Sequence, residues 1–158
     1  MNLRIGQGFD AHRFSDDASR ALVLGGVVIP GSPGLAGHSD ADALAHALSD
    51  ALLGAASLGD IGQRFPDTDP RYAGADSMGL LSEVVLLVSG AGFGALNADC
   101  TVIAERPKLS AHLAAMADGL SAAIGAPVSV KATRGEGLGA IGRAEGIACL
   151  AVVLLDSR

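Results

Sequence analysis

The strongest constraint on the fold of this chain is an uninterrupted apolar run near its C-terminal end, at residues 147–155. An apolar run of this length, rich in branched side chains, is typical of a strand that is buried on both faces. We therefore expect the segment 145–155 to be central in a sheet or to lie at an interface. The run is far shorter than the roughly 20 apolar residues that a membrane-spanning helix needs.

The composition predicts one compact domain with a buried subunit interface. At 158 residues, the chain is long enough for a single domain, 1–158, which should bury roughly 70% of its unfolded surface. Hydrophobic residues make up 49% of the chain and charged residues only 18%. So few charges cannot cover a monomer well, which favours an oligomer.

Charge and aromatic content argue against nucleic acid and membranes as partners. The net charge is −6, no run of Lys or Arg is present, and aromatic residues amount to 3%, so the chain offers neither a basic patch nor a stacking platform. Cys100 and Cys149 are isolated and are expected to be free thiols in a reducing compartment. Because several charged residues also interrupt the first 20 positions, we expect a cytoplasmic protein without a secretory signal.

Strand-like and helix-like segments follow one another along the chain. The strands are expected at 3–12, 21–29, 99–104, 128–133 and 145–155, and the helices at about 40–56, 76–89 and 110–124. Ser39 or Asp40 is expected to cap the first helix. The segment 59–70 is expected to be a long irregular loop, and such loops are more often functional than plain connectors.

Two short stretches carry the residues with the most evident chemistry. Asp10 and His12 are two positions apart on an expected strand, which places both side chains on one face. His46 follows Asp42 by four positions in the expected helix, within a polar stripe, so it should face a site rather than the core. One aspartate and two histidines are common ligands of a catalytic zinc ion. The alternative is that these are ordinary surface residues, because neither HExxH nor paired CxxC motifs are present.

The second half of the chain gathers groups that bind anions. They are Lys108, Lys131, Thr133, Arg134 and Arg143. Cations and hydroxyls near glycines can form a phosphate cradle, and Glu136 can hold a hard cation such as Mg²⁺ beside a phosphate. The alternative for the glycine-rich stretch 135–142 is a mobile loop, because it lacks the context of a known phosphate-binding fingerprint.

Six motifs together resemble the 2-C-methyl-D-erythritol 2,4-cyclodiphosphate synthase family of the non-mevalonate isoprenoid pathway, over about residues 4–155. The motifs are GFDAH (8–12), GHSDAD (37–42), DALLGA (50–55), LGDIG (58–62), FPDTDP (65–70) and GRAEGI (142–147). The resemblance implies an α+β fold, with a single mixed β-sheet and helices packed on one face. It also implies a homotrimer with active sites between neighbouring subunits.

The resemblance further implies the roles of individual residues. One Zn²⁺ per subunit is expected on Asp10, His12 and His46, with His38 as a group that stabilises the transition state. Glu136 is expected to carry Mg²⁺ or Mn²⁺ with the diphosphate. The expected contacts to the methylerythritol part are Asp60, Ile61, Gly62 and the loop 65–69, with Phe65, Asp67 and Asp69. The segment 104–110, with Ala104, Lys108, Leu109 and Ser110, is expected to hold the cytidine and its phosphates, together with Ala132 and Thr133. Ser39, Ala140 and Arg143 are further expected substrate-binding residues.

The implied reaction releases CMP from 4-diphosphocytidyl-2-C-methyl-D-erythritol 2-phosphate. The 2-phosphate oxygen is already ionised and attacks the β-phosphorus, so that orientation and charge neutralisation replace a general base. Two alternatives remain, of which the first needs the same metal ligands and the second uses the metal only structurally. They are a zinc-dependent phosphohydrolase that uses water as the nucleophile, and a trimeric module that only binds isoprenoid diphosphates.

The chain departs from the family pattern at three positions. Arg134 and Gly135 stand where the family commonly has threonines, one of which steadies the transition state. An arginine at this position can still bind phosphate with a different reach, so we expect Arg134 to be a catalytic group. Ala140 stands where a phenylalanine commonly lines the trimer axis. The apolar cavity that relatives have on that axis is therefore not expected to carry over to this chain.

Overall fold

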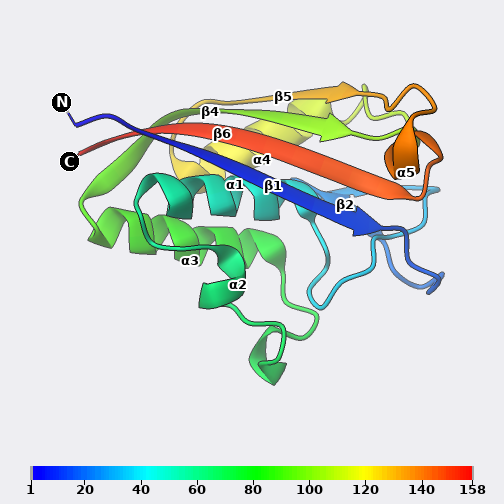
Figure 1. The fold of residues 1–158 in the computed structure, drawn as a ribbon, viewed down its shortest axis with the longest axis horizontal. Helices are drawn as coiled ribbons and strands as arrows, with labels where there is room; N and C mark the ends of the chain where they lie inside the picture. The colour runs from blue at the N-terminus through cyan, green and yellow to red at the C-terminus, as the bar shows by residue number, and fades with distance from the viewer. Residues whose placement is uncertain (1, 158) are drawn as a thin grey trace.

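The computed structural model describes residues 2–157, and a four-stranded mixed sheet forms its centre (Figure 1). The strands are β1 (Arg4–Arg13), β4 (Phe93–Ile103), β5 (Val128–Thr133) and β6 (Gly146–Ser157), in the order β1-β6-β4-β5. β6 is antiparallel to both β1 and β4, whereas β4 and β5 are parallel. The apolar run thus lies in a central strand, as its sequence predicts.

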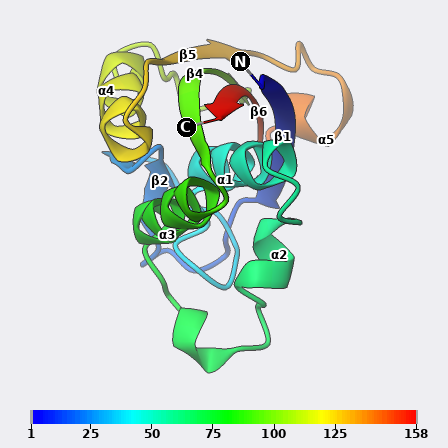
Figure 2. The same cartoon turned by 90° about the vertical axis from the view of Figure 1, so that its left-hand side faces the viewer.

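Three long helices cover one face of this sheet. They are α1 (Ala43–Ala55), α3 (Ser77–Gly90) and α4 (Leu113–Ile124). The end-on view in Figure 2 shows α1 directly against the strands, with α3 beyond it. On the opposite face, Ile5, Phe9 and Val152 are exposed. An α+β fold with one mixed sheet and helices on it is therefore confirmed.

Two glycines of β1 allow α1 to approach the sheet closely. A Cβ atom on Gly6 would lie 1.9 Å from the carbonyl oxygen of Ala51, and one on Gly8 would lie 1.9 Å from that of Ala47. No side chain fits at such distances. Because side chains alternate along a strand, residues 10 and 12 face α1 in the same way as residues 6 and 8. The glycines therefore bring α1 down onto the face that carries Asp10 and His12.

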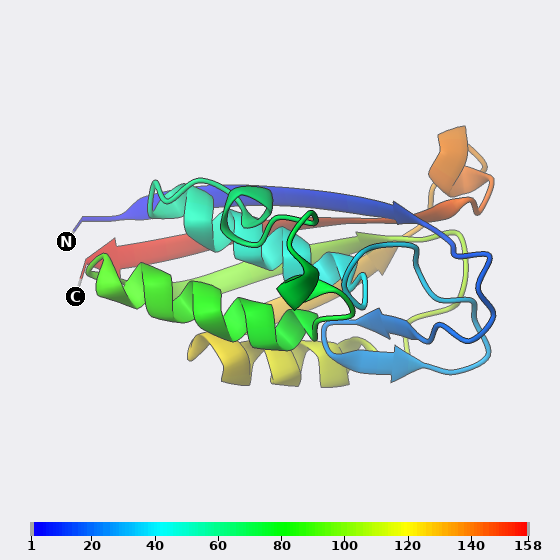
Figure 3. The same cartoon turned by 90° about the horizontal axis from the view of Figure 1, so that it is seen from below.

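The segment 21–29 is a hairpin rather than the single strand that its apolar pattern suggests. β2 (Leu22–Leu24) pairs antiparallel with β3 (Val27–Ile29) in a separate two-stranded sheet, seen from the helix side in Figure 3. Gly25 and Gly26 connect them with φ values of 57° and 74°. Two successive residues with positive φ are what a tight hairpin turn requires. The hairpin is an addition to the expected single sheet.

Asp42, and neither Ser39 nor Asp40, caps α1. Its Oδ1 accepts hydrogen bonds from the amides of Leu44 and Ala45 at 3.1 and 3.0 Å. The same carboxylate accepts from the amides of Gly25 and Gly26 at 2.8 and 2.7 Å. Asp42 is therefore buried and joins the hairpin to α1, whereas the sequence placed it on a polar helix face. Burial raises the pKa of this carboxyl, although these backbone donors lower it in part.

Other boundaries differ from the expected ones by several residues. β4 begins at Phe93 rather than near 99, and α4 begins at Leu113 rather than near 110. The expected irregular loop at 59–70 contains the short helix α2 (Ile61–Arg64), and the 3-10 helix η1 (Pro70–Tyr72) follows it. The glycine-rich stretch contains the short helix α5 (Gly139–Gly142). Among the described residues, every helix is too short or too polar to cross a bilayer.

Candidate functional site

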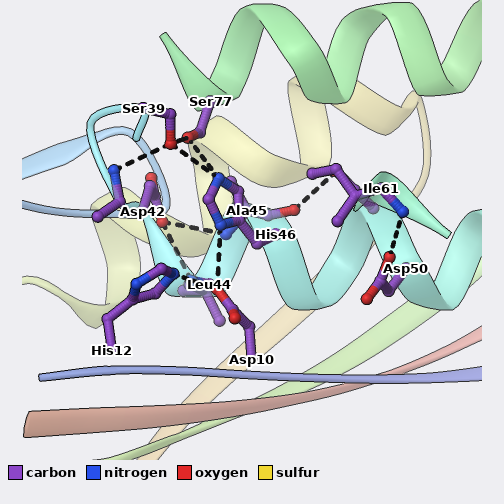
Figure 4. A network of polar contacts seen from close by, with 12 residues as sticks. Asp10, His12, Ser39, Asp42, Leu44, Ala45, His46, Asp50, Ile61 and Ser77 are labelled. Atoms are coloured by element: carbon purple, nitrogen blue, oxygen red, sulfur yellow. Dashed lines mark hydrogen bonds and ion pairs between the residues drawn. The ribbon is translucent and has the colours of Figure 1, made fainter. Parts of the chain in front are cut away.

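Asp10, His12 and His46 converge on one point between β1 and α1 (Figure 4). Asp10 Oδ2 lies 2.8 Å from His12 Nε2 and 3.0 Å from His46 Nδ1. One ligand atom from each of the three residues falls within 4.8 Å of the other two. The sequence prediction that these side chains meet is therefore confirmed, since the strand period and the glycine-mediated approach of α1 bring them together.

The hydrogen bonds of His12 leave one ring nitrogen without a partner. His12 Nδ1 lies 2.7 Å from the carbonyl oxygen of Ala36. A carbonyl only accepts, so Nδ1 carries the proton in this contact. Nε2 is close to Asp10 but makes no hydrogen bond of acceptable geometry and is shielded from solvent. A buried imidazole nitrogen without a partner, facing a carboxylate, is a ready ligand for a cation.

The electrostatics of the cluster keep Asp10 ionised. Burial has the largest single influence and raises its pKa, but the close contacts to the imidazoles of His12 and His46 together outweigh it and hold the pKa well below its usual range. Conversely, the close contact with the carboxylate of Asp10 raises the pKa of His12, against the effect of burial.

The donor set fits a transition-metal ion. Two imidazole nitrogens and one carboxylate oxygen are the ligands that catalytic zinc sites use, with a further position left for water or substrate. The carbonyl of Ala36 fixes the ring of His12 from behind, as second-layer groups do in metal sites. The cluster can therefore hold a metal ion.

A cavity of about 470 Å³ opens over this cluster. The predicted residues that line it, besides the three possible ligands, are His38, Ser39, Ile61, Gly62, Phe65 and Asp67. Tyr72 and Leu80 also line it and were not predicted. Their positions in η1 and α3 gave no signal in the sequence, because only the tertiary fold brings these elements to the rim.

Two of the predicted substrate contacts, Asp60 and Asp69, do not line this cavity but stabilise the local structure of their own segment. Asp60 caps α2 by accepting from the amide of Gln63 at 2.8 Å. Asp69 caps η1 and pairs with Arg71 at 2.7 Å. The loop is anchored to α1 by Asp50, whose Oδ1 accepts from the amide of Ile61 at 2.7 Å (Figure 4). These bonds shape the wall formed by residues 61–67.

A second cavity, of about 200 Å³, lies at the ends of β4 and β5. It is lined by the predicted residues Ala104, Lys108, Leu109, Ser110, Ala132, Thr133 and Arg134. Glu105 and Pro107, which fall within the segment 104–110 expected to hold the cytidine and its phosphates, complete the lining. Glu105 pairs with Arg134 at 2.5 Å, and this contact lowers the pKa of Glu105.

The two cavities lie at opposite edges of the sheet. Asp10 and His12 are on β1, whereas Ala132 and Thr133 are on β5, and these are the two edge strands. The cavities share no lining residue. At the usual spacing between strands, β1 and β5 are roughly 14 Å apart.

The remaining predicted residues line neither cavity. Glu136 lies in the loop after β5 with a φ of 51°, and Ala140 is in α5. Arg143 donates to Glu145 at 2.7 Å. These three residues lie between β5 and β6, at the end of the sheet where β1 also ends.

Comparisons with known proteins agree over nearly the whole chain. The model of the YgbB family matches residues 3–156. The 2-C-methyl-D-erythritol 2,4-cyclodiphosphate synthase of Laribacter hongkongensis is 57% identical over 161 residues, which cover 100% of this chain and 98% of that protein. A solved structure of the bifunctional IspDF from Campylobacter jejuni has a TM-score of 0.94 at 44% identity. It covers 99% of this chain, which spans 43% of that longer protein.

A structure of IspF from Plasmodium falciparum, described as a CDP complex, has a TM-score of 0.85 at 34% identity and covers 99% of this chain and 97% of that one. The family match, the full-length relatives and the shared fold agree with the six sequence motifs and with the cluster of one aspartate and two histidines. The chain therefore belongs to the YgbB family, the family of the 2-C-methyl-D-erythritol 2,4-cyclodiphosphate synthases.

Proposed function

We propose that this chain converts 4-diphosphocytidyl-2-C-methyl-D-erythritol 2-phosphate into 2-C-methyl-D-erythritol 2,4-cyclodiphosphate and CMP, a step in the synthesis of isoprenoid precursors. The observation that carries this proposal is the convergence of Asp10, His12 and His46 under a cavity. This cluster occurs in a chain that is similar, over nearly its full length, to proteins named 2-C-methyl-D-erythritol 2,4-cyclodiphosphate synthase.

Asp10, His12 and His46 would hold one Zn²⁺ per subunit, through Oδ2, Nε2 and Nδ1. The partnerless Nε2 of His12 supports this assignment. When bound, the ion supplies Lewis-acid polarisation of a phosphate oxygen and a positive charge beside two phosphates. The chain's own contribution is to keep Asp10 ionised and both rings oriented.

The protein has to orient the substrate rather than activate a nucleophile. An oxygen of the 2-phosphate forms the new bond to the β-phosphorus, and the bond from that phosphorus to the CMP oxygen breaks. Because the attacking oxygen is already ionised, the residues need only place it in line and offset the repulsion between the phosphates. His38 and Ser39 line the cavity beside the cluster and would bind the phosphates. Ile61, Gly62 and Phe65 would contact the carbon skeleton.

The smaller cavity would bind the cytidine diphosphate part. Lys108 and Thr133 supply a cation and a hydroxyl there, and Leu109 and Ser110 complete this side of the lining. The CDP complex of the Plasmodium relative supports a nucleotide ligand. Glu136, in the loop after β5, would carry Mg²⁺ or Mn²⁺ with the diphosphate, since these ions prefer carboxylate and phosphate oxygens.

The active form would be a homotrimer with sites between subunits. The cavity at the β1 edge and the cavity at the β5 edge are separate within one chain. Two neighbouring copies can place the β1 edge of one against the β5 edge of the next, which would join the two halves. The exposed Ile5, Phe9 and Val152 on the open face of the sheet support such contact.

The cytoplasm is the compartment that best fits this chain. Cys100 and Cys149 are both free and buried. Free thiols without a disulfide framework are typical of a reducing environment.

The deciding experiment incubates the purified chain with the cytidine substrate, Zn²⁺ and Mg²⁺, and follows CMP and the mass of the second product. We expect CMP and the cyclic diphosphate in equal amounts. Free phosphate in place of the cyclic product would indicate a phosphohydrolase. Binding without CMP release would indicate a binding module.

A further inference from the structure

Ser77, the first residue of α3, lies directly behind His46. Its Oγ is 2.8 Å from His46 Nε2, on the side of the ring opposite Asp10 (Figure 4). Ser77 is only 1% exposed and is not among the residues that line the cavity. It touches the cavity lining through the ring of His46 and, at 3.4 Å, through Ser39 Oγ.

Asp40 holds Ser77 in place through both carboxylate oxygens. The amide of Ser77 donates to Oδ2 at 3.1 Å, and the hydroxyl of Ser77 donates to Oδ1. The amide of Asp42 also donates to Oδ1, at 3.1 Å. All of these groups are donors, which is what an ionised carboxylate accepts.

These contacts fix where the proton of His46 lies. A serine hydroxyl has one hydrogen, and Ser77 gives it to Asp40, so its oxygen can only accept from His46 Nε2. Ser39 Oγ, 3.2 Å from the same nitrogen, accepts from the amide of Ala41, and its own hydrogen can be donated to Ser77 Oγ, 3.4 Å away. An unprotonated Nε2 would face the oxygen of Ser77 at 2.8 Å with no hydrogen between them. Nε2 is therefore protonated, which in a neutral ring leaves a lone pair on Nδ1.

That lone pair is directed at Asp10 Oδ2, which is 3.0 Å away. A lone pair and a carboxylate repel each other unless a cation lies between them. The tautomer that Ser77 selects is thus the one that binds a metal ion through Nδ1, and it is unsuited to a neutral hydrogen bond with Asp10.

We propose that Ser77, held by Asp40, is a positioning residue that fixes the tautomer and ring orientation of His46 for metal binding through Nδ1. This inference depends on the metal site of the proposed function. It links the N-terminal end of α3, which carries no ligand, to the metal affinity of a site formed by β1 and α1.

The test compares Ser77→Ala with Ser82→Ala in the full chain. Ser82 lies on the same helix, and its exposed hydroxyl donates to the carbonyl of Met78 at 3.0 Å, so its removal controls for loss of a serine on α3. Zn²⁺ affinity is measured by competition with a chelator. We expect Ser77→Ala to weaken binding about 10- to 100-fold, as removal of a group behind a metal ligand does, and Ser82→Ala to leave it unchanged.

A second measurement reads the proton directly. In ¹⁵N spectra of the zinc-loaded wild type, His46 should show an Nε2–H signal protected from exchange with water. This signal should broaden or vanish in Ser77→Ala. Equal zinc affinity in Ser77→Ala and wild type, or an unprotonated Nε2 in the wild type, would overturn the inference.

The two proposals can fail separately. If the wild type itself binds no Zn²⁺, the metal site of the proposed function is wrong. If Ser77→Ala does not fold, Asp40→Asn replaces it, because loss of the carboxylate charge frees the Ser77 hydroxyl to donate toward His46. We expect Asp40→Asn to weaken Zn²⁺ binding as well, and an unchanged affinity would again overturn the role of Ser77.

Discussion

Arg134 donates two hydrogen bonds to a single oxygen of Glu105, one from Nε at 3.0 Å and one from a terminal nitrogen at 2.5 Å. Glu105 follows β4 and Arg134 follows β5, so the pair joins the two segments that enclose the smaller cavity. The carboxylate is only 17% exposed, whereas the arginine is 63% exposed. Glu105 therefore anchors the guanidinium at the wall of that cavity.

Replacement of Arg134 by alanine should slow CMP release about 10²- to 10³-fold, the usual effect of removing one donor to transition-state charge. Arg134→Thr keeps a hydroxyl donor at this position and should lose less. Both are measured as kcat at saturating substrate. An unchanged kcat in Arg134→Ala would restrict Arg134 to its pairing with Glu105.

His46→Ala should abolish zinc loading and CMP release together. The change removes one of the three proposed protein ligands, and a Lewis acid supplies several kcal/mol of transition-state stabilisation, which corresponds to a loss of about 10³-fold or more. Zinc content after dialysis and CMP formation are measured on the same sample. Full turnover by a zinc-free His46→Ala protein would refute the proposed mechanism.

Glu136→Gln should weaken the dependence on Mg²⁺ while zinc stays bound. The amide keeps the size of the side chain but loses the charge that a hard cation prefers. We expect the Mg²⁺ concentration for half-maximal activity to rise about tenfold, equivalent to ~1.4 kcal/mol. A Mg²⁺ titration with parallel metal analysis checks this, and loss of zinc from the variant would contradict the assigned role.

Ile5→Asp should break the proposed trimer. Ile5 is 74% exposed on the open face of the sheet, and a carboxylate buried there between subunits would lack a partner. Light scattering should give about 15.7 kDa, the mass of one chain, in place of three times that mass. Leu86→Asp on α3 is the matched control, because Leu86 is 71% exposed on the helical side and the variant should stay trimeric. A trimeric Ile5→Asp would argue against an interface on this face.

The two thiols should resist alkylation in the folded protein. Burial raises the pKa of Cys100 to about 12 and that of Cys149 well above its ordinary value. At pH 8 only about one Cys100 side chain in 10⁴ is then a thiolate, the form that reacts. Iodoacetamide at pH 8 should leave the native mass unchanged and modify both residues in guanidinium chloride. Rapid modification of the native protein would contradict this burial.

The possible metal ligands could be predicted because their signals are local. The two-residue period of a strand places Asp10 and His12 on one face of β1. The 3.6-residue period of a helix places His46 on the polar face of α1. The same local rules failed at Asp42, whose partners in the turn at Gly25 and Gly26 are distant in sequence. They failed for 21–29 as well, where an apolar run conceals a turn of two glycines.

The sequence by itself determined that residues 147–155 form a buried strand, that Asp10 and His12 share one face of a strand, and that His46 lies on a polar helix face. Apolar runs and side-chain periods are properties of a single segment, so they can be recognised in the sequence without knowledge of the fold. Only the tertiary structure decided how closely α1 sits on Gly6 and Gly8, and that Asp40 and Ser77 stand behind His46. It also decided that the two cavities lie at opposite edges of the sheet. These features arise from contacts between segments far apart in the chain, and no local pattern encodes them.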